Sequence, residues 1–186
     1  VLFWFFNILP QGGLRIAIEQ KQWYWLMINN FTHTSGIHLL SSLAFFLGVH
    51  TLIVAEGFSI WRYIIHFFAI SLGVSIGFLL FTHKFSVLGL SGLYYGLYIT
   101  WSLLVYKSDR KLALWMIAAM GFEIALEHFG AYRPFVSIIE SIIDLDNLDL
   151  NAVAYECHIF GIVSAFIIFF LDISYSKLKK YIVKSS

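Results

Sequence analysis

Long apolar segments, each bounded by polar or charged residues, limit the possible folds of this sequence more than any other feature. Five of them cover residues 37–55, 60–82, 88–106, 112–129 and 153–171. Each is long enough to cross the roughly 30 Å hydrocarbon core of a bilayer as an α-helix, which rises about 1.5 Å per residue. The sequence therefore predicts an all-α membrane protein.

The composition supports the same class of protein. Of the 186 residues, 60% are hydrophobic and 12% are charged, whereas soluble globular proteins carry about 25% charged residues. Too few charged side chains remain to cover a water-facing surface. The net charge of +1 and the lack of a basic run predict no nucleic-acid partner. A single cysteine, Cys157, excludes an internal disulfide and a cysteine-built metal site.

Residues 1–9 are also apolar, but as a helix they would span only about half of a bilayer core. No small-residue cleavage site follows them, which disfavours a signal peptide. We interpret them as the end of a first membrane helix whose beginning is missing. Because no repeat or Pro-rich linker divides the chain, residues 1–186 are predicted to form one domain, a bundle of six transmembrane helices.

The basic residues predict the orientation of this bundle. If the lysine-rich C-terminus is cytoplasmic, eight of the twelve Lys and Arg residues fall inside and four outside, as the positive-inside rule requires. Residues 11–36 and 130–152 are then long outer connections. Isoleucines recur at helical spacing in residues 137–144, which fits a short helix in the outer interface and equally fits a loop packed on the bundle.

Three predicted helices carry polar residues in their first two turns, at the outer end. They are His38 and Ser42 in residues 37–55, Ser91 in residues 88–106 and His158 in residues 153–171. Ionisable groups in a membrane are costly and usually face a bundle interior or a wet cavity. A serine hydroxyl is a weak nucleophile until an adjacent base takes its proton, and histidine suits that task. The matched depth therefore favours Ser91 and His158 as a nucleophile and its base.

Glycines accompany both residues. Gly89 and Gly92 lie on either side of Ser91, and Gly161 follows His158 by one helical turn. Small residues let membrane helices approach closely, and a glycine before the serine permits a tight entry that exposes backbone N–H groups. Taken singly, such glycines and serines often only pack, and a lone histidine often only bonds a backbone carbonyl. The combination at one depth favours catalysis.

These residues resemble the motifs of the rhomboid family of intramembrane serine proteases. Gly-Leu-Ser-Gly at residues 89–92, followed by Tyr95, resembles the family's nucleophile motif, and Cys-His-Ile-Phe-Gly at residues 157–161 resembles its histidine motif. Phe-Thr-His at residues 31–33 and His-Leu at residues 38–39 resemble the pattern at the start of the second helix. Order, spacing and predicted sidedness agree over essentially the whole chain.

The resemblance implies a serine endopeptidase that opens to the outer side and cleaves transmembrane or membrane-anchored proteins without a cofactor or metal. Tyr95 would stack on the imidazole of His158 and stand in for a missing triad carboxylate. His38 and the backbone N–H of Ser91 would form the oxyanion hole. His33 would be a structural, hydrogen-bonding histidine in the outer loop.

The chain departs from the family pattern at two of these positions. Ser42 stands where the family usually has asparagine, and its shorter side chain can donate one hydrogen bond toward the oxyanion. Cys157 replaces the usual alanine and is predicted to be an inert core residue, since a thiol in apolar surroundings keeps its proton.

Further residues are similar to the rhombosortase branch, compact bacterial rhomboids that process Gly-Gly sorting tails. They are Glu123, Glu127 and the run Val-Ala-Tyr-Glu-Cys-His at residues 153–158. In these proteins position 95 is often histidine. The branch implies cleavage of C-terminally anchored proteins at the bacterial inner membrane.

Three other functions remain open. A rhomboid-like pseudoprotease would bind transmembrane segments without cutting them, although intact Ser91 and His158 argue against it. A metal or haem protein, or a glutamate-based protease, would use the seven histidines or the pair Glu123 and Glu127. The His-x-x-x-Asn pattern of paired-glutamate proteases is absent, so Glu127 is expected instead to bond into the bundle, to residues 130–152 or to a substrate terminus.

Overall fold

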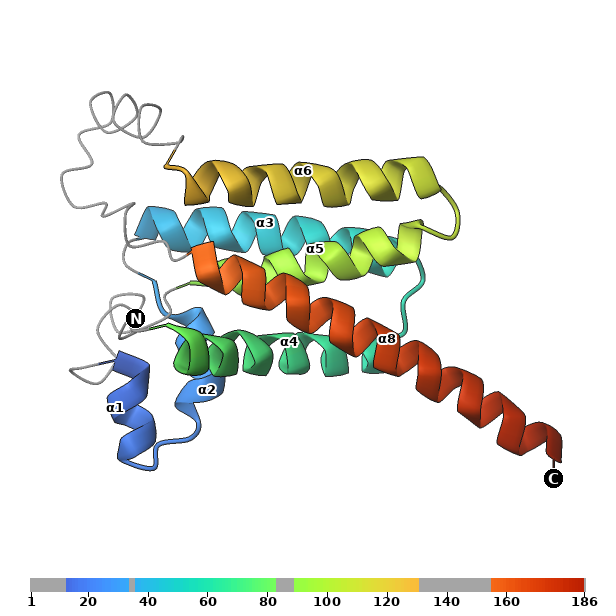
Figure 1. Cartoon of the computed structure of the whole chain (residues 1–186), viewed down its shortest axis with the longest axis horizontal. Coiled ribbons are helices and arrows are strands. Elements are labelled where there is room, and N and C mark those ends of the chain that lie inside the picture. Colours follow the sequence, from blue (N-terminus) through green and yellow to red (C-terminus); the bar gives the residue numbers. More distant parts are fainter. Residues whose placement is uncertain (1–12, 34–35, 83–88, 131–154, 186) are drawn as a thin grey trace.

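Each of the five predicted segments contains a long helix in the structure, a computed structural model that describes residues 13–33, 36–82, 89–130 and 155–185 (Figure 1). Side chains are described at residues 14, 16–33, 39–82, 89–130 and 156–175. The long helices are α3 (Gly36–Ala55), α4 (Ile60–Phe81), α5 (Ser91–Val105), α6 (Arg110–His128) and α8 (Tyr155–Ser185). Because the described residues form helices and no strands, the all-α class is confirmed. The predictions for residues 1–9 and 137–144 lie outside the described residues.

Short helices occupy the connection that precedes α3. They are α1 (Gly13–Glu19), α2 (Trp25–Ile28) and the 3-10 helix η2 (Asn29–Phe31). The buried amide Nδ2 of Asn30 donates to the hydroxyls of Ser71 and Ser75, at 3.0 and 3.1 Å, and to the Ser71 carbonyl oxygen at 3.1 Å. These hydrogen bonds fasten η2 to the middle of α4.

The central helix is α5, which packs against α3, α4, α6 and α8 (Figure 1). Neighbouring helices along the chain run in opposite directions, so α3, α5 and α8 begin at the end of the bundle where α4 and α6 finish. At the opposite end the turn from α5 into α6 is closed by Asp109, whose side chain accepts a 2.9 Å hydrogen bond from the N–H of Leu112. This topology brings the starts of three helices together, as the sequence predicted.

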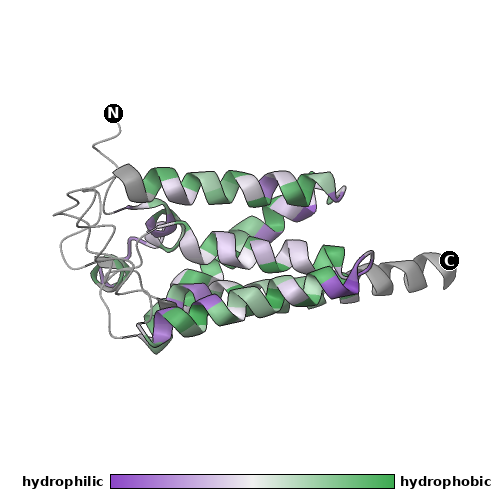
Figure 2. Cartoon of the chain, turned by 90° about the horizontal axis from the view of Figure 1, so that it is seen from above, coloured by the Kyte–Doolittle hydropathy of each residue, from purple (hydrophilic) through white to green (hydrophobic). Residues whose placement is uncertain are grey.

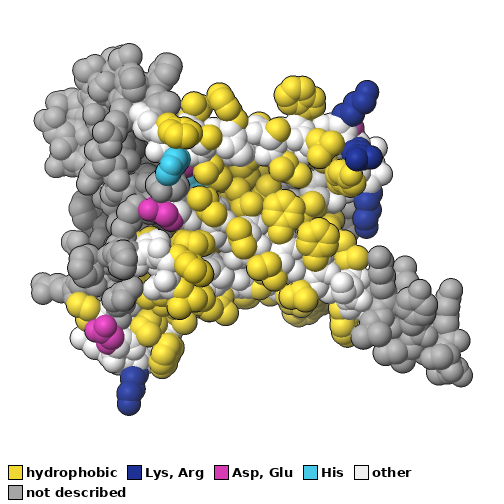
Figure 3. Space-filling model, in the orientation of Figure 1, with side chains coloured by type: hydrophobic (Ala, Val, Ile, Leu, Met, Phe, Trp, Pro, Cys, Tyr) yellow, Lys and Arg dark blue, Asp and Glu magenta, His cyan; other side chains and the backbone are white. Residues whose placement is uncertain are grey.

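Apolar side chains cover the outside of the bundle. Trp61 on α4 is 73% exposed and Trp115 on α6 is 76% exposed, whereas the polar Thr100 and Ser102 on α5 are completely buried. Figure 2 shows hydrophobic residues along every long helix, and Figure 3 shows basic side chains gathered where α5 turns into α6. Such an inverted distribution is typical of helices that face lipid.

Within the part of the chain that the structure describes, two helices are long and apolar enough to cross a membrane: α4, and residues Glu156–Tyr175 within α8. The apolar part of α3, Leu39–Ala55, is shorter. These helices support a membrane protein, and the count of six spans stays a prediction. Helix α8 continues to Ser185, well beyond the predicted end at residue 171, because the charged residues that close the apolar window do not break a helix.

Candidate active site

Helices α5 and α8 approach each other backbone to backbone. A Cβ atom on Gly92 would lie 2.7 Å from the carbonyl oxygen of Cys157, and one on Gly96 would lie 2.7 Å from that of Gly161. A Cβ on Gly161 would overlap the carbonyl oxygen of Gly92. Any larger residue at these positions would force the two helices apart. The glycines therefore set the close approach that the sequence predicted for this pair.

A glycine also shapes the start of α5. Gly89 has a φ of 105°, a left-handed conformation that glycine adopts without strain. One residue separates it from Ser91, the first residue of α5, which is 4% exposed. The first N–H groups of a helix have no carbonyl partner within the helix. The backbone at Ser91 can therefore donate to an anion.

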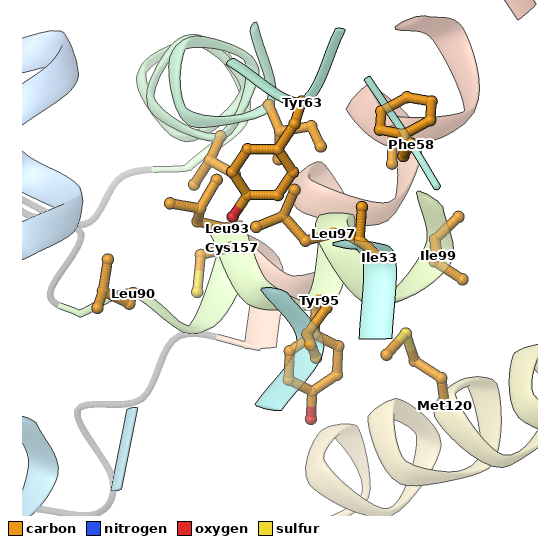
Figure 4. Packing of buried hydrophobic residues seen from close by; sticks show 14 of the residues in the cluster. Ile53, Phe58, Tyr63, Leu90, Leu93, Tyr95, Leu97, Ile99, Met120 and Cys157 are labelled. Atoms are coloured by element: carbon orange, nitrogen blue, oxygen red, sulfur yellow. The ribbon is translucent and has the colours of Figure 1, made fainter. Parts of the chain in front are cut away.

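The hydroxyl of Ser91 faces α8. Its Oγ lies 3.5 Å from Sγ of Cys157 and forms a hydrogen bond with it, and Figure 4 shows Cys157 beside the first turn of α5. His158, the next residue, is 2% exposed. Among the described residues, no hydrogen bond joins Ser91 to His158, and Nε2 of His158 has no hydrogen-bond partner. Both side chains therefore lie at the buried contact between α5 and α8, but they do not form a hydrogen bond with each other.

Two contacts fix the imidazole of His158. Tyr95, one turn after Ser91, stacks on its face with ring centroids 4.0 Å apart and ring planes 3° from parallel. At its edge, Nδ1 lies 2.7 Å from Oε2 of Glu127, near the end of α6. The expectation that this imidazole has no carboxylate partner was wrong, because Glu127 provides one.

Sequence reasoning missed the partnership of Glu127 and His158. The available signal was a glutamate inside an apolar helix, which is costly unless a polar partner satisfies it. Glu123, one turn earlier, is exposed and interacts with the side chain of Tyr95 rather than with His158. The sequence does not specify how α6 is rotated about its axis, and that rotation decides which glutamate faces α8.

The remaining predicted residues lie around this centre or outside the described part. The ring of His33 is buried, and its Nδ1 donates to the carbonyl oxygen of Phe31 at 3.0 Å. Ser42 is buried on α3. His38 lies in the first turn of α3, but its side chain is outside the described residues. The oxyanion role of His38 and Ser42 therefore stays a prediction. Within the described ranges, no cluster of His, Cys, Asp and Glu is arranged to hold a metal ion.

Comparison with known proteins gives one match. The family model described as Rhomboid domain matches residues 20–175, a range that includes Ser91, Glu127 and His158. No curated protein and no solved structure matches the chain.

Proposed function

Because the chain belongs to the rhomboid family, we propose that it is an intramembrane serine endopeptidase with Ser91 as nucleophile and His158 as general base. The observation that supports this most is the unpartnered Nε2 of His158, buried next to the residue that contacts Ser91 Oγ. A buried nitrogen without a hydrogen bond is costly. A hydroxyl that donates to Nε2 removes this cost and becomes a stronger nucleophile.

The first chemical step needs a small rearrangement. Rotation of the Ser91 side chain exchanges its contact with Cys157 for a hydrogen bond to Nε2 of His158. Oγ then attacks the substrate carbonyl carbon while its proton passes to Nε2. The resulting tetrahedral oxyanion accepts hydrogen bonds from the backbone N–H groups at the start of α5, and from His38 and Ser42 as the family resemblance implies. Preorganised donors of this kind contribute about 3 kcal/mol each to lowering the barrier.

The second half of the reaction reuses the same imidazole. His158 returns the proton to the leaving amine, and the C-terminal fragment departs. A water molecule then donates a proton to Nε2 and attacks the acyl-enzyme. As the bond to Oγ breaks, Nε2 returns this proton to Oγ, and the new carboxyl terminus leaves. A peptide bond inside a regular helix is shielded by its side chains, so substrates with small residues at the cut, where the helix unwinds easily, are expected.

The location of the reaction follows from the charges. Ser91 and His158 lie at the end of the bundle opposite the turn that holds Lys107, Arg110 and Lys111 (Figures 1 and 3). The positive-inside rule favours a cytoplasmic position for this turn, which supports a site at the outer face of the membrane. In line with the resemblance to rhombosortases, we assign the protein to a bacterial inner membrane and its substrates to proteins with a Gly-Gly sequence before a C-terminal membrane helix.

Cleavage of a reporter tests the activity. The reporter carries Gly-Gly, a membrane helix and a basic tail at its C-terminus, and its mass after co-expression shows whether the tail was removed. Ser91→Ala and His158→Ala are expected to abolish cleavage. The matched control is Ser102→Ala, which should cleave normally. Ser102 is a buried serine on the same helix, and its hydroxyl donates to the Tyr98 carbonyl oxygen.

The outcomes separate the candidate functions. Loss of cleavage after replacing Gly-Gly by Val-Val would support the sorting-tail substrate. Cleavage of both reporters would keep the protease and reject that substrate. An intact reporter that copurifies with the wild-type chain would instead favour a protein that binds transmembrane segments without cutting them.

A further inference from the structure

Glu127 makes a short polar contact with the proposed base. Its Oε2 lies 2.7 Å from Nδ1 of His158, and the contact joins the last turn of α6 to the first turn of α8. The side chains of His158 and Glu127 are 2% and 20% exposed. A charge-assisted hydrogen bond of this length is short and strong.

This contact decides which nitrogen of His158 is the base. An ionised carboxylate has no hydrogen to give and can only accept. Nδ1 therefore carries the hydrogen, and the lone pair is on Nε2. Nε2 is also the nitrogen without a partner, and it is the one that must accept the proton of Ser91.

The contact also stabilises the charge that forms during the reaction. When Ser91 loses its proton, the imidazole becomes positively charged in a place with little water. A carboxylate at hydrogen-bond distance offsets that charge, and the effect is larger in a low-dielectric site than in water. Tyr95 covers the face of the ring but brings no charge. Among the described residues, Glu127 is the charged group in hydrogen-bond contact with this imidazole, so it supplies electrostatic support.

We infer that Glu127 completes a Ser91–His158–Glu127 triad as its positioning residue: it holds the Nδ1–H tautomer of His158 and stabilises the imidazolium. This inference rests on the proposed protease function. A purely structural ion pair between α6 and α8 is the alternative, and it makes different predictions. A structural pair affects folding alone, whereas a triad member affects turnover in a protein that remains folded and binds substrate.

Three variants distinguish these roles. Glu127→Gln keeps the shape of the side chain and removes its charge, whereas Glu127→Asp keeps the charge and shortens the reach. Glu56→Gln makes the same chemical change at an exposed position just after α3, at the opposite end of the bundle, and is the control. Because loss of the aspartate of a serine-protease triad lowers kcat about 10⁴-fold, we expect Glu127→Gln to lower kcat by about 10²- to 10⁴-fold with KM nearly unchanged.

Rescue and tautomer measurements complete the test. Glu127→Asp should cleave faster than Glu127→Gln although glutamine is closer in shape. Nitrogen-15 NMR of labelled histidine should show that Nδ1 of His158 is protonated and Nε2 is unprotonated in the wild type. Glu127→Gln should show a mixture of the two tautomers. The melting temperature of each variant shows whether it is folded.

A failure of the triad can be distinguished from a failure of the proposed protease function. If the wild type cleaves and Glu127→Gln cleaves equally fast, the inference is overturned and the protease stands. If Glu127→Gln loses turnover only in proportion to its loss of folded protein, the pair is structural and the inference is again overturned. If the wild type neither cleaves nor reacts with a serine-directed fluorophosphonate, the proposed function falls and the triad falls with it.

Discussion

Tyr95 lies flat on the imidazole of His158, with ring centroids 4.0 Å apart and planes 3° from parallel. Tyr95 is 2% exposed and comes from the central helix, and Figure 4 shows its ring directed toward α6. The stack restricts rotation of the imidazole about its Cβ–Cγ bond. The stack and the contact with Glu127 at the ring edge together fix the orientation of the imidazole and therefore the position of Nε2.

Replacement of Tyr95 tests this restraint. Tyr95→Ala removes the ring and should lower kcat by about 10- to 100-fold, because a small misplacement of a catalytic group can cost about 10²-fold. Tyr95→Phe keeps the aromatic face and should lose little. The measurement is the rate of reporter cleavage by purified protein in detergent. Equal rates for Tyr95→Ala and Tyr95→Phe would show that the stack does not position the base.

A second prediction concerns the contact of α5 with α8. Gly161→Ala places a methyl group against the carbonyl oxygen of Gly92, so we expect the free energy of unfolding to fall by about 3 kcal/mol, the upper end of the range for overpacked cores. Gly121→Ala is the control, because a Cβ there meets nothing within 4 Å. It should be neutral or stabilise the helix by about 0.5–1 kcal/mol. If both variants unfold at the same denaturant concentration, the helices are not in backbone contact.

A third prediction separates stability from catalysis. Near the start of α4, away from Ser91, Nε of Arg62 donates to Oδ2 of Asp172 in the middle of α8 at 2.7 Å. Nε2 of His66 lies 3.5 Å from the same oxygen. Asp172→Asn should lower the free energy of unfolding by about 1 kcal/mol, since Arg62 is partly exposed to screening. Turnover by the folded protein should be unchanged. A loss of kcat comparable with that of Glu127→Gln would mean that the two ends of the bundle are coupled.

The contact between Ser91 and Cys157 leads to a fourth prediction. If the Ser91 hydroxyl leaves Sγ of Cys157 for Nε2 of His158 during the reaction, Cys157→Ala removes a competitor and should keep or raise the cleavage rate. The buried thiol, 2% exposed, should react with maleimide only after unfolding. Loss of cleavage in folded Cys157→Ala would assign the thiol a part in the reaction.

The long helices could be predicted from the sequence because the mean hydropathy of a segment depends only on the residues within it. The windows at residues 60–82 and 112–129 agree with α4 and α6 within a few residues. The short helices before residue 33 were not predicted, since residues 13–31 mix polar, aromatic and apolar side chains without a single period. Their position depends on contacts such as those of Asn30 with α4, which link residues far apart in the chain.

The candidate site was less accessible to sequence reasoning. Ser91, Tyr95 and His158 were found because they lie in short motifs that resemble a known family, and their roles stay predictions. Glu127 was considered with Glu123 but given no role toward the imidazole. The contact of Glu127 with His158 depends on the rotation of α6 and on the close approach of α5 and α8, and neither is a property of a local segment.

Mass-spectrometric mapping of a fluorophosphonate adduct tests the pairing of Ser91 and His158 most directly. The purified wild-type protein, Ser102→Ala and His158→Ala are treated with the probe, digested and sequenced. We expect one adduct on Ser91 in the wild type and in Ser102→Ala, and almost none in folded His158→Ala. An adduct on another residue, or equal labelling of Ser91 with and without His158, would contradict the account.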